Sequence, residues 1–154
     1  MPTALNPADF FHTGIVVADL DTAMKDLTAL ADYRWTTPMT NTIAVRIGTE
    51  IQSVPDVTFR MSYSVQAPHL ELVQAIPGTL WTPAPGTAAH HLSYFVDEVA
   101  MASQRLEAAG FAFEAGTDVF AYHNNPLGVR IEIVQRGLFG DWPAFVEAAS
   151  AGRS

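Results

Sequence analysis

Two short runs of mostly hydrophobic residues are each followed by a pattern of apolar positions that is typical of a helix. Residues 12–17 read His-Thr-Gly-Ile-Val-Val, and residues 91–96 read His-Leu-Ser-Tyr-Phe-Val, which repeats the same pattern 79 positions later. A short apolar run of this length is typical of a buried strand. We therefore predict a strand at each place, and the repeat indicates that one structural unit has been duplicated.

A helix is predicted after each of these strands, because apolar residues recur at positions i, i+3, i+7 and i+10. These residues are Leu20, Ala23, Leu27 and Leu30 in the first half, and Val99, Ala102, Leu106 and Ala109 in the second. The spacing predicts that one face of each helix is buried. Acidic residues open both helices, where they complement the exposed N–H groups, and Gly110 ends the second helix.

Three more strands are predicted after each helix, where β-rich segments are separated by glycine, proline and asparagine. They are roughly residues 43–47, 57–65 and 69–75 in the first half, and 111–114, 119–123 and 129–135 in the second. Each half is therefore a β-α-β-β-β module. The predicted fold class is α+β, with two tandem βαβββ modules that form a curved mixed sheet or half-barrel with a cavity.

The length of 154 residues is that of one compact domain, and 49% hydrophobic residues are enough to build a core. We expect a single domain over residues 1–154, with module one at about residues 9–75 and module two at about residues 89–136. A C-terminal helical tail is expected at about residues 141–150, with Asp141 as its N-cap and packing as its role.

The charge pattern excludes several classes of partner. The formal net charge is −8, and the basic residues are Lys25 and seven scattered arginines. Without a basic cluster, no nucleic-acid partner is expected, and a large polyanionic substrate such as a coenzyme A thioester is disfavoured. The chain has no cysteine, so any metal must be held by nitrogen and oxygen. No signal segment or membrane span is recognised, so the expected location is the cytoplasm, without a membrane partner.

Each module begins with a histidine and carries a glutamate in its last strand, which gives the pairs His12 with Glu71 and His91 with Glu132. A lone carboxylate in an apolar strand is costly to bury unless it has a cation or a strong partner. A single residue of this kind is more often a histidine packed in the core or a glutamate on the solvated face of a strand. That interpretation does not explain why both residues occur at equivalent positions of the two modules. If the first and last strands of each module face each other, the four side chains can converge on one divalent ion, such as Zn²⁺, Ni²⁺, Co²⁺, Mn²⁺ or Fe²⁺.

Two further groups of residues are candidates for the cavity wall. Strand alternation places the first group on the same face as a predicted ligand, and it consists of His69, Ser93, Phe95 and Arg130. The second group lies near strand ends and consists of Tyr63, Tyr122 and His123. Its members either orient a substrate and pass protons or simply pack, and packing is the more common role.

Four segments carry a resemblance to a known family. They are HTGIVVADL at residues 12–20, LEL at 70–72, HHLSYFVDE at 90–98 and GVRIEIV at 128–134. Over roughly residues 9–136 the chain resembles the vicinal oxygen chelate superfamily, which includes glyoxalase I, methylmalonyl-CoA epimerase, extradiol dioxygenases and bleomycin- and fosfomycin-resistance proteins. The resemblance implies the metal ligands His12, Glu71, His91 and Glu132, and a homodimer. It also implies that a metal chelated by substrate oxygens stabilises an enolate or a similar anion.

Three functions follow from this resemblance. The leading interpretation is an isomerase, epimerase or lyase that acts on a small apolar or aromatic oxygenated molecule, with Glu71 or Glu132 as the general base. The alternative is a non-haem iron dioxygenase, which typically needs only two histidines and one carboxylate. The second alternative is a protein without catalytic activity that binds and sequesters a small molecule such as an antibiotic.

Overall fold

The computed structural model describes residues 3–48, 54–83 and 86–150, which fall into two compact units. Unit one consists of His12–Thr42, Thr58–His90 and Phe139–Ser154. Unit two consists of Met1–Phe11, Ile43–Val57 and His91–Leu138. Unit one therefore carries most of the first sequence repeat and the C-terminal tail, whereas unit two carries the second repeat.

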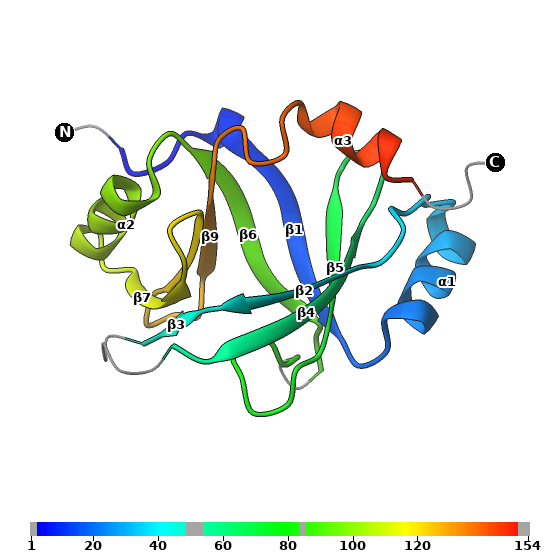
Figure 1. The fold of residues 1–154 in the computed structure, drawn as a ribbon, viewed down its shortest axis with the longest axis horizontal. Helices are drawn as coiled ribbons and strands as arrows, with labels where there is room; N and C mark the ends of the chain where they lie inside the picture. Colours follow the sequence, from blue (N-terminus) through cyan, green and yellow to red (C-terminus); the bar gives the residue numbers. More distant parts are fainter. Residues whose placement is uncertain (1–2, 49–53, 84–85, 151–154) are drawn as a thin grey trace. The chain divides into compact units, whose positions relative to one another are not determined.

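Unit one is a sheet with helix α1 packed on it, and it also contains the C-terminal helix described below. Its elements are β1 (Phe10–Val17), α1 (Leu20–Ala31), β2 (Met39–Ala44), β4 (Asp56–Tyr63) and β5 (Leu70–Gln74). The strands follow the order β2-β4-β5-β1, with β1 parallel to β5 and β4 antiparallel to β5 (Figure 1). Leu20 of α1, Trp35 and Leu72 of β5 form the buried core that joins the helix to the sheet.

Helix α1 begins and ends at residues suited to those positions. The carboxylate of Asp19 accepts a hydrogen bond from the Thr22 backbone N–H at 2.8 Å, which satisfies one of the free N–H groups of the first turn. The helix ends at Asp32, which has a left-handed backbone with φ of 58°. Leu30, predicted on the buried face, is 80% exposed. The prediction was wrong there because the tenth residue after Leu20 lies about 80° away from it around the helix.

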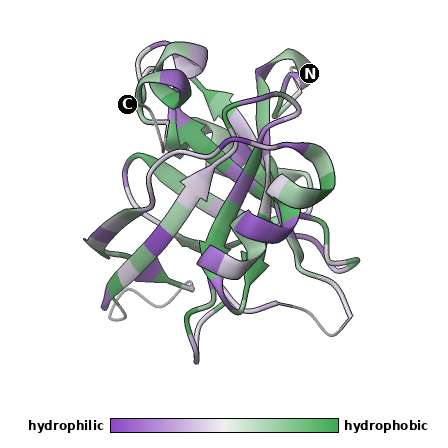
Figure 2. Cartoon of the chain, turned by 90° about the vertical axis from the view of Figure 1, so that its right-hand side faces the viewer, coloured by the Kyte–Doolittle hydropathy of each residue, from purple (hydrophilic) through white to green (hydrophobic). Residues whose placement is uncertain are grey.

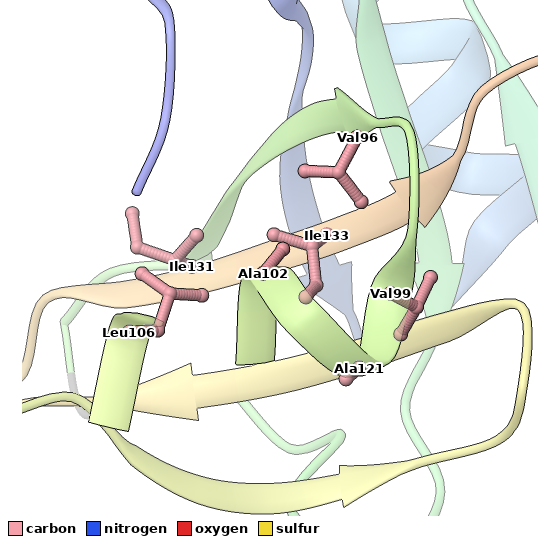
Figure 3. Close-up of a cluster of buried hydrophobic side chains, with 7 residues drawn as sticks. All are labelled: Val96, Val99, Ala102, Leu106, Ala121, Ile131 and Ile133. Atoms are coloured by element: carbon pink, nitrogen blue, oxygen red, sulfur yellow. The ribbon is translucent and has the colours of Figure 1, made fainter. Parts of the chain in front are cut away.

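Unit two repeats this arrangement. Its elements are β6 (Ala89–Val96), α2 (Val99–Ala108), β7 (Ala112–Gly116), β8 (Phe120–Asn124) and β9 (Arg130–Gln135), together with the short strand β3 (Arg46–Ile47) and a 3-10 turn, η1 (Pro7–Asp9). The strands follow the order β6-β9-β8-β7-β3, and only β6 and β9 are parallel. Figure 3 shows the cluster under α2, which consists of Val96, Val99, Ala102, Leu106, Ala121, Ile131 and Ile133.

The segment predicted as one strand at residues 43–47 is interrupted at Val45, which is buried. Before the break, β2 lies beside β4, and after it β3 pairs with β7. Gly116 is the partner of Arg46 in this pairing. A Cβ atom at Gly116 would lie 2.6 Å from the carbonyl oxygen of Phe120, so the turn between β7 and β8 requires glycine.

The tail forms the predicted helix, α3 (Trp142–Ala148), and Asp141 caps it by accepting from the Ala144 N–H at 3.1 Å. The Thr37 N–H donates to the carbonyl of Ala149 at 2.8 Å, which fastens the end of α3 within unit one. Figure 2 shows that the strands and helices carry both hydrophobic and hydrophilic residues. The α+β class, the mixed sheets and the two βαβββ modules are confirmed. Among the described residues, no helix has the length and apolarity needed to cross a membrane.

Candidate metal centre

The first His–Glu pair lies in unit one, where β1 runs parallel to β5. In this register Gly14 is the partner of Glu71, so His12 stands two residues before the partner of the glutamate. His12 Nε2 lies 3.5 Å from Glu71 Oε1. Both residues are buried, with 1% and 4% of their surfaces exposed.

The second pair lies in unit two and has the same construction. Strand β6 runs parallel to β9 with Ser93 as the partner of Glu132, so His91 again stands two residues before the partner of the glutamate. His91 Nε2 lies 3.5 Å from Glu132 Oε1, and the two residues are 3% and 7% exposed. The equal registers and equal distances support the duplication inferred from the sequence.

These two pairs make up a group of buried side chains that offers one ligand atom each to a metal ion: His12, Glu71, His91 and Glu132. The donor set suits a divalent cation. Two imidazole nitrogens and two carboxylate oxygens match the preferences of zinc and its transition-metal neighbours, and the total charge of the two carboxylates balances a divalent ion. Burial of the carboxylates also fits a bound cation, because an uncompensated buried charge is costly.

A tyrosine accompanies each pair. Tyr63 of β4 is the strand partner of Glu71, and its ring is edge-on to His12 with centroids 5.5 Å apart. Tyr122 of β8 is the strand partner of Glu132, and its ring is edge-on to His91 at 5.1 Å. Both tyrosines are buried. Each unit thus presents a histidine, a glutamate and a tyrosine in equivalent places, which the sequence analysis did not foresee as a set.

The two pairs differ in how the glutamate is held. The hydroxyl of Ser93 donates a hydrogen bond to Glu132 Oε1 at 2.6 Å, and both residues are buried. The equivalent position in unit one is Gly14, which has no side chain to donate. The alternation of side chains along the strand predicted that Ser93 lies on the same face as His91. The hydrogen bond from Ser93 to Glu132 is consistent with that prediction.

Trp142, at the start of α3, is a neighbour of the first pair that sequence reasoning missed. Its ring lies 6.3 Å from that of His12 and packs edge-on against Tyr63 at 4.9 Å. His69, the residue predicted on the face of Glu71, is edge-on to Trp142 at 5.6 Å, and its Nδ1 lies 3.0 Å from the Ser64 carbonyl oxygen. The tail therefore supplies an aromatic wall beside His12 as well as packing.

The other predicted wall residues have different surroundings. Arg130 forms an ion pair with Glu114 at 2.8 Å. Phe95 stacks on Phe11 with ring centroids 3.7 Å apart. His123 is fully buried, and its two ring nitrogens lie within hydrogen-bond distance of Ser103 and of the Phe111 carbonyl. Burial lowers the pKa of His123. It is not a member of the His–Glu group described above.

Comparison with known proteins places the sequence in a family. The family model of the Glyoxalase/Bleomycin resistance protein/Dioxygenase superfamily matches residues 11–126. This range contains His12, Glu71 and His91, and it ends before Glu132. No curated protein matches the chain.

Solved structures with a similar fold include two methylmalonyl-CoA epimerases. The Streptomyces coelicolor epimerase, as a variant in complex with 2-nitronate-propionyl-CoA, is 16% identical with a TM-score of 0.59, and the match covers 84% of this chain and 95% of that one. The Mycobacterium tuberculosis epimerase is 17% identical with a TM-score of 0.56, covering 88% and 92%. A hypothetical protein from Bacillus halodurans C-125 is 14% identical with a TM-score of 0.51, covering 82% and 93%.

The structural matches have low sequence identity and support the fold alone. The family model, in contrast, matches the sequence over well more than half of its length. The chain belongs to the glyoxalase/bleomycin resistance protein/dioxygenase superfamily.

Proposed function

We propose that His12, Glu71, His91 and Glu132 hold one divalent metal ion, and that the protein is a metal-dependent enzyme of the isomerase, epimerase or lyase type. The observation that carries the proposal is the presence of two buried His–Glu pairs with the same strand register and the same 3.5 Å separation. A bound divalent cation would act as a Lewis acid that neutralises negative charge on a substrate oxygen. Candidate ions are Zn²⁺, Ni²⁺, Co²⁺, Mn²⁺ and Fe²⁺.

The protein's own residues would move the proton. Each glutamate lies in a buried setting beside a histidine, where bulk water has little access. A carboxylate of Glu71 or Glu132 would take a proton from the substrate carbon adjacent to the carbonyl group, and the negative charge would develop on the polarised carbonyl oxygen. The same carboxylate, or the other one, would return it to a neighbouring atom or to the opposite face. Ser93 would keep Glu132 in one orientation during this exchange.

The substrate we propose is a small oxygenated organic molecule of apolar or aromatic character. The aromatic rings of Tyr63 and Trp142 next to His12 favour an apolar group. The chain has no cluster of basic residues for a nucleotide carrier, and four of its seven arginines form ion pairs with acidic residues: Arg34, Arg60, Arg130 and Arg136. We therefore propose a substrate without coenzyme A, unlike the epimerases of similar fold. We also predict a homodimer, which light scattering after size-exclusion chromatography checks.

The assignment of the base is tested with Glu71→Gln and Glu132→Gln. Glutamine keeps an oxygen ligand but cannot accept the proton, so at least one variant should retain the metal and lose about 100-fold or more in turnover of an enolisable substrate. Deuterium exchange at the substrate carbon, followed by NMR, measures this step directly. Full exchange rates in both metal-loaded variants would contradict the role of either glutamate.

Oxygen dependence separates the proposed chemistry from the dioxygenase alternative. Proton transfer needs no oxidant, so turnover should be unchanged under anaerobic conditions, whereas a dioxygenase would stop. A protein that binds a small molecule without metal and without exchange would support sequestration instead.

A further inference from the structure

Unit two contains a buried histidine that the proposed metal centre does not use. His123 lies in β8, and its ring is fully buried beneath α2. Nδ1 lies 2.9 Å from the carbonyl oxygen of Phe111, and Nε2 lies 2.7 Å from the hydroxyl of Ser103 in α2. Both ring nitrogens therefore have a defined partner.

The chemistry of these partners determines where the protons are. A carbonyl oxygen can only accept, so Nδ1 must donate to Phe111. In the neutral ring Nε2 is then the acceptor, and the Ser103 hydroxyl donates to it. Burial lowers the pKa of His123, which supports the neutral form near neutral pH. The result is a serine hydroxyl hydrogen-bonded to the basic nitrogen of an oriented imidazole, which is the arrangement that activates a serine nucleophile.

Solvent reaches the serine but not the base. Ser103 is only partly buried and lines a groove of about 470 Å³ in unit two. The wall of this groove also includes Gln104, Glu107 and Phe113, and Arg46 lies over the ring of Phe113 with its guanidinium carbon 5.2 Å from the ring centroid. A small molecule in the groove would therefore lie against Ser103.

We propose that Ser103 and His123 form a second reactive site, at which the Ser103 hydroxyl accepts an acyl group from small activated carboxylic esters. The groove sets the preferred class of ester. Its charged side chains are Arg46 and three carboxylates, Glu98, Glu107 and Asp118. The excess of negative charge disfavours anionic esters, so uncharged or cationic esters are the expected substrates.

The reaction balances with the groups present. Ser103 Oγ attacks the ester carbonyl carbon while His123 Nε2 takes the hydroxyl proton. The bond from that carbon to the leaving oxygen then breaks, and the proton passes from Nε2 to the departing alkoxide or phenoxide. The product is an O-acyl serine and a free alcohol or phenol.

A backbone carbonyl, rather than a carboxylate, orients His123, so the reaction is expected to be slow. Loss of the orienting carboxylate costs about 10⁴-fold in a serine protease. We therefore expect stoichiometric acylation over minutes to hours rather than rapid turnover.

The test uses p-nitrophenyl acetate and the full chain, with EDTA present so that the metal centre contributes nothing. Intact-mass spectrometry should show one added acetyl group, and peptide mapping should place it on Ser103. Ser103→Ala should lose this label, while Thr42→Ala, which removes an exposed hydroxyl bonded to Thr58, should react like the wild type. Acetyl groups found only elsewhere, such as on Lys25, would overturn the proposal.

Two further measurements examine the role of His123. His123→Gln should slow labelling of Ser103 at least tenfold while circular dichroism remains that of a folded chain. In the wild type, the labelling rate should rise with pH and then level off once the imidazole is neutral, because burial lowers the pKa of His123 below its ordinary value. Acylation of a lysine amine, in contrast, keeps rising toward pH about 10. A rate at Ser103 that kept rising with pH would overturn the role of the histidine even if the variant failed to fold.

Discussion

Removing the Ser93 hydroxyl should weaken metal binding without unfolding the protein. Ser93 is fully buried and donates to Glu132 Oε1 at 2.6 Å, a short bond to an ionisable acceptor. A hydrogen bond to a charged group contributes about 1.5–3 kcal/mol. Loss of a partner that orients a metal ligand typically lowers metal affinity by about 10-fold to 100-fold, or about 1.4–2.8 kcal/mol. The two ranges agree, so Ser93→Ala should raise the Kd for Zn²⁺ by about 10-fold to 100-fold.

Competition with a chromophoric chelator measures this Kd. Ser93→Thr keeps the hydroxyl and should restore most of the affinity if the side chain fits. Ser62→Ala is the matched control, because it deletes another fully buried hydroxyl, one that donates to the Thr36 carbonyl at 2.7 Å rather than to a glutamate. It should reduce stability and leave the Kd unchanged. Equal affinities for Ser93→Ala and the wild type would refute the role of the hydroxyl in the site.

Two predictions concern the stability of unit two. Burial lowers the pKa of His123 below its ordinary value of 6.5, so the unfolded chain takes up a proton at a pH where the folded chain does not. The contribution of His123 to the unfolding free energy should be constant above pH about 6.5 and should decrease below it. Urea titrations of the wild type and of His123→Gln should therefore show that the unfolding free energy falls more steeply with decreasing pH in the wild type. Parallel curves for the two proteins would contradict this prediction. Leu106→Ala removes a side chain that is 2% exposed in the cluster under α2, and should cost about 2–5 kcal/mol in the same assay, whereas a loss below about 1 kcal/mol would show that the cluster is loosely packed.

The module architecture could be predicted because the repeat constrains both halves at once. An apolar run headed by a histidine, a helical face and a glutamate in an apolar strand each carry little information alone. Their recurrence defined the strands that hold His12, Glu71, His91 and Glu132. The structure adds the parallel registers of β1 with β5 and of β6 with β9, which set the distance within each pair.

Other features depend on contacts between residues far apart in sequence. No local pattern indicates that the strand is interrupted at Val45 and that β3 then pairs with β7. The position of Trp142 beside His12 depends on how α3 docks, which its own amphipathic sequence does not specify. The sequence pattern places His123 in a strand, but it does not indicate the partners of its ring. These partners, Ser103 and Phe111, come from a helix and from the segment after it.

The central claim is that both repeats contribute ligands to one ion, and metal stoichiometry tests it most directly. Metal-free protein titrated with Zn²⁺ and analysed by mass spectrometry of the elements should bind one tight equivalent per chain, a number that follows from four ligands around a single ion. His12→Ala and His91→Ala should each abolish this tight binding, although the two residues lie in different units. Two equivalents per chain that fall to one in either variant would contradict the shared site, as would no tight binding in the unmodified chain.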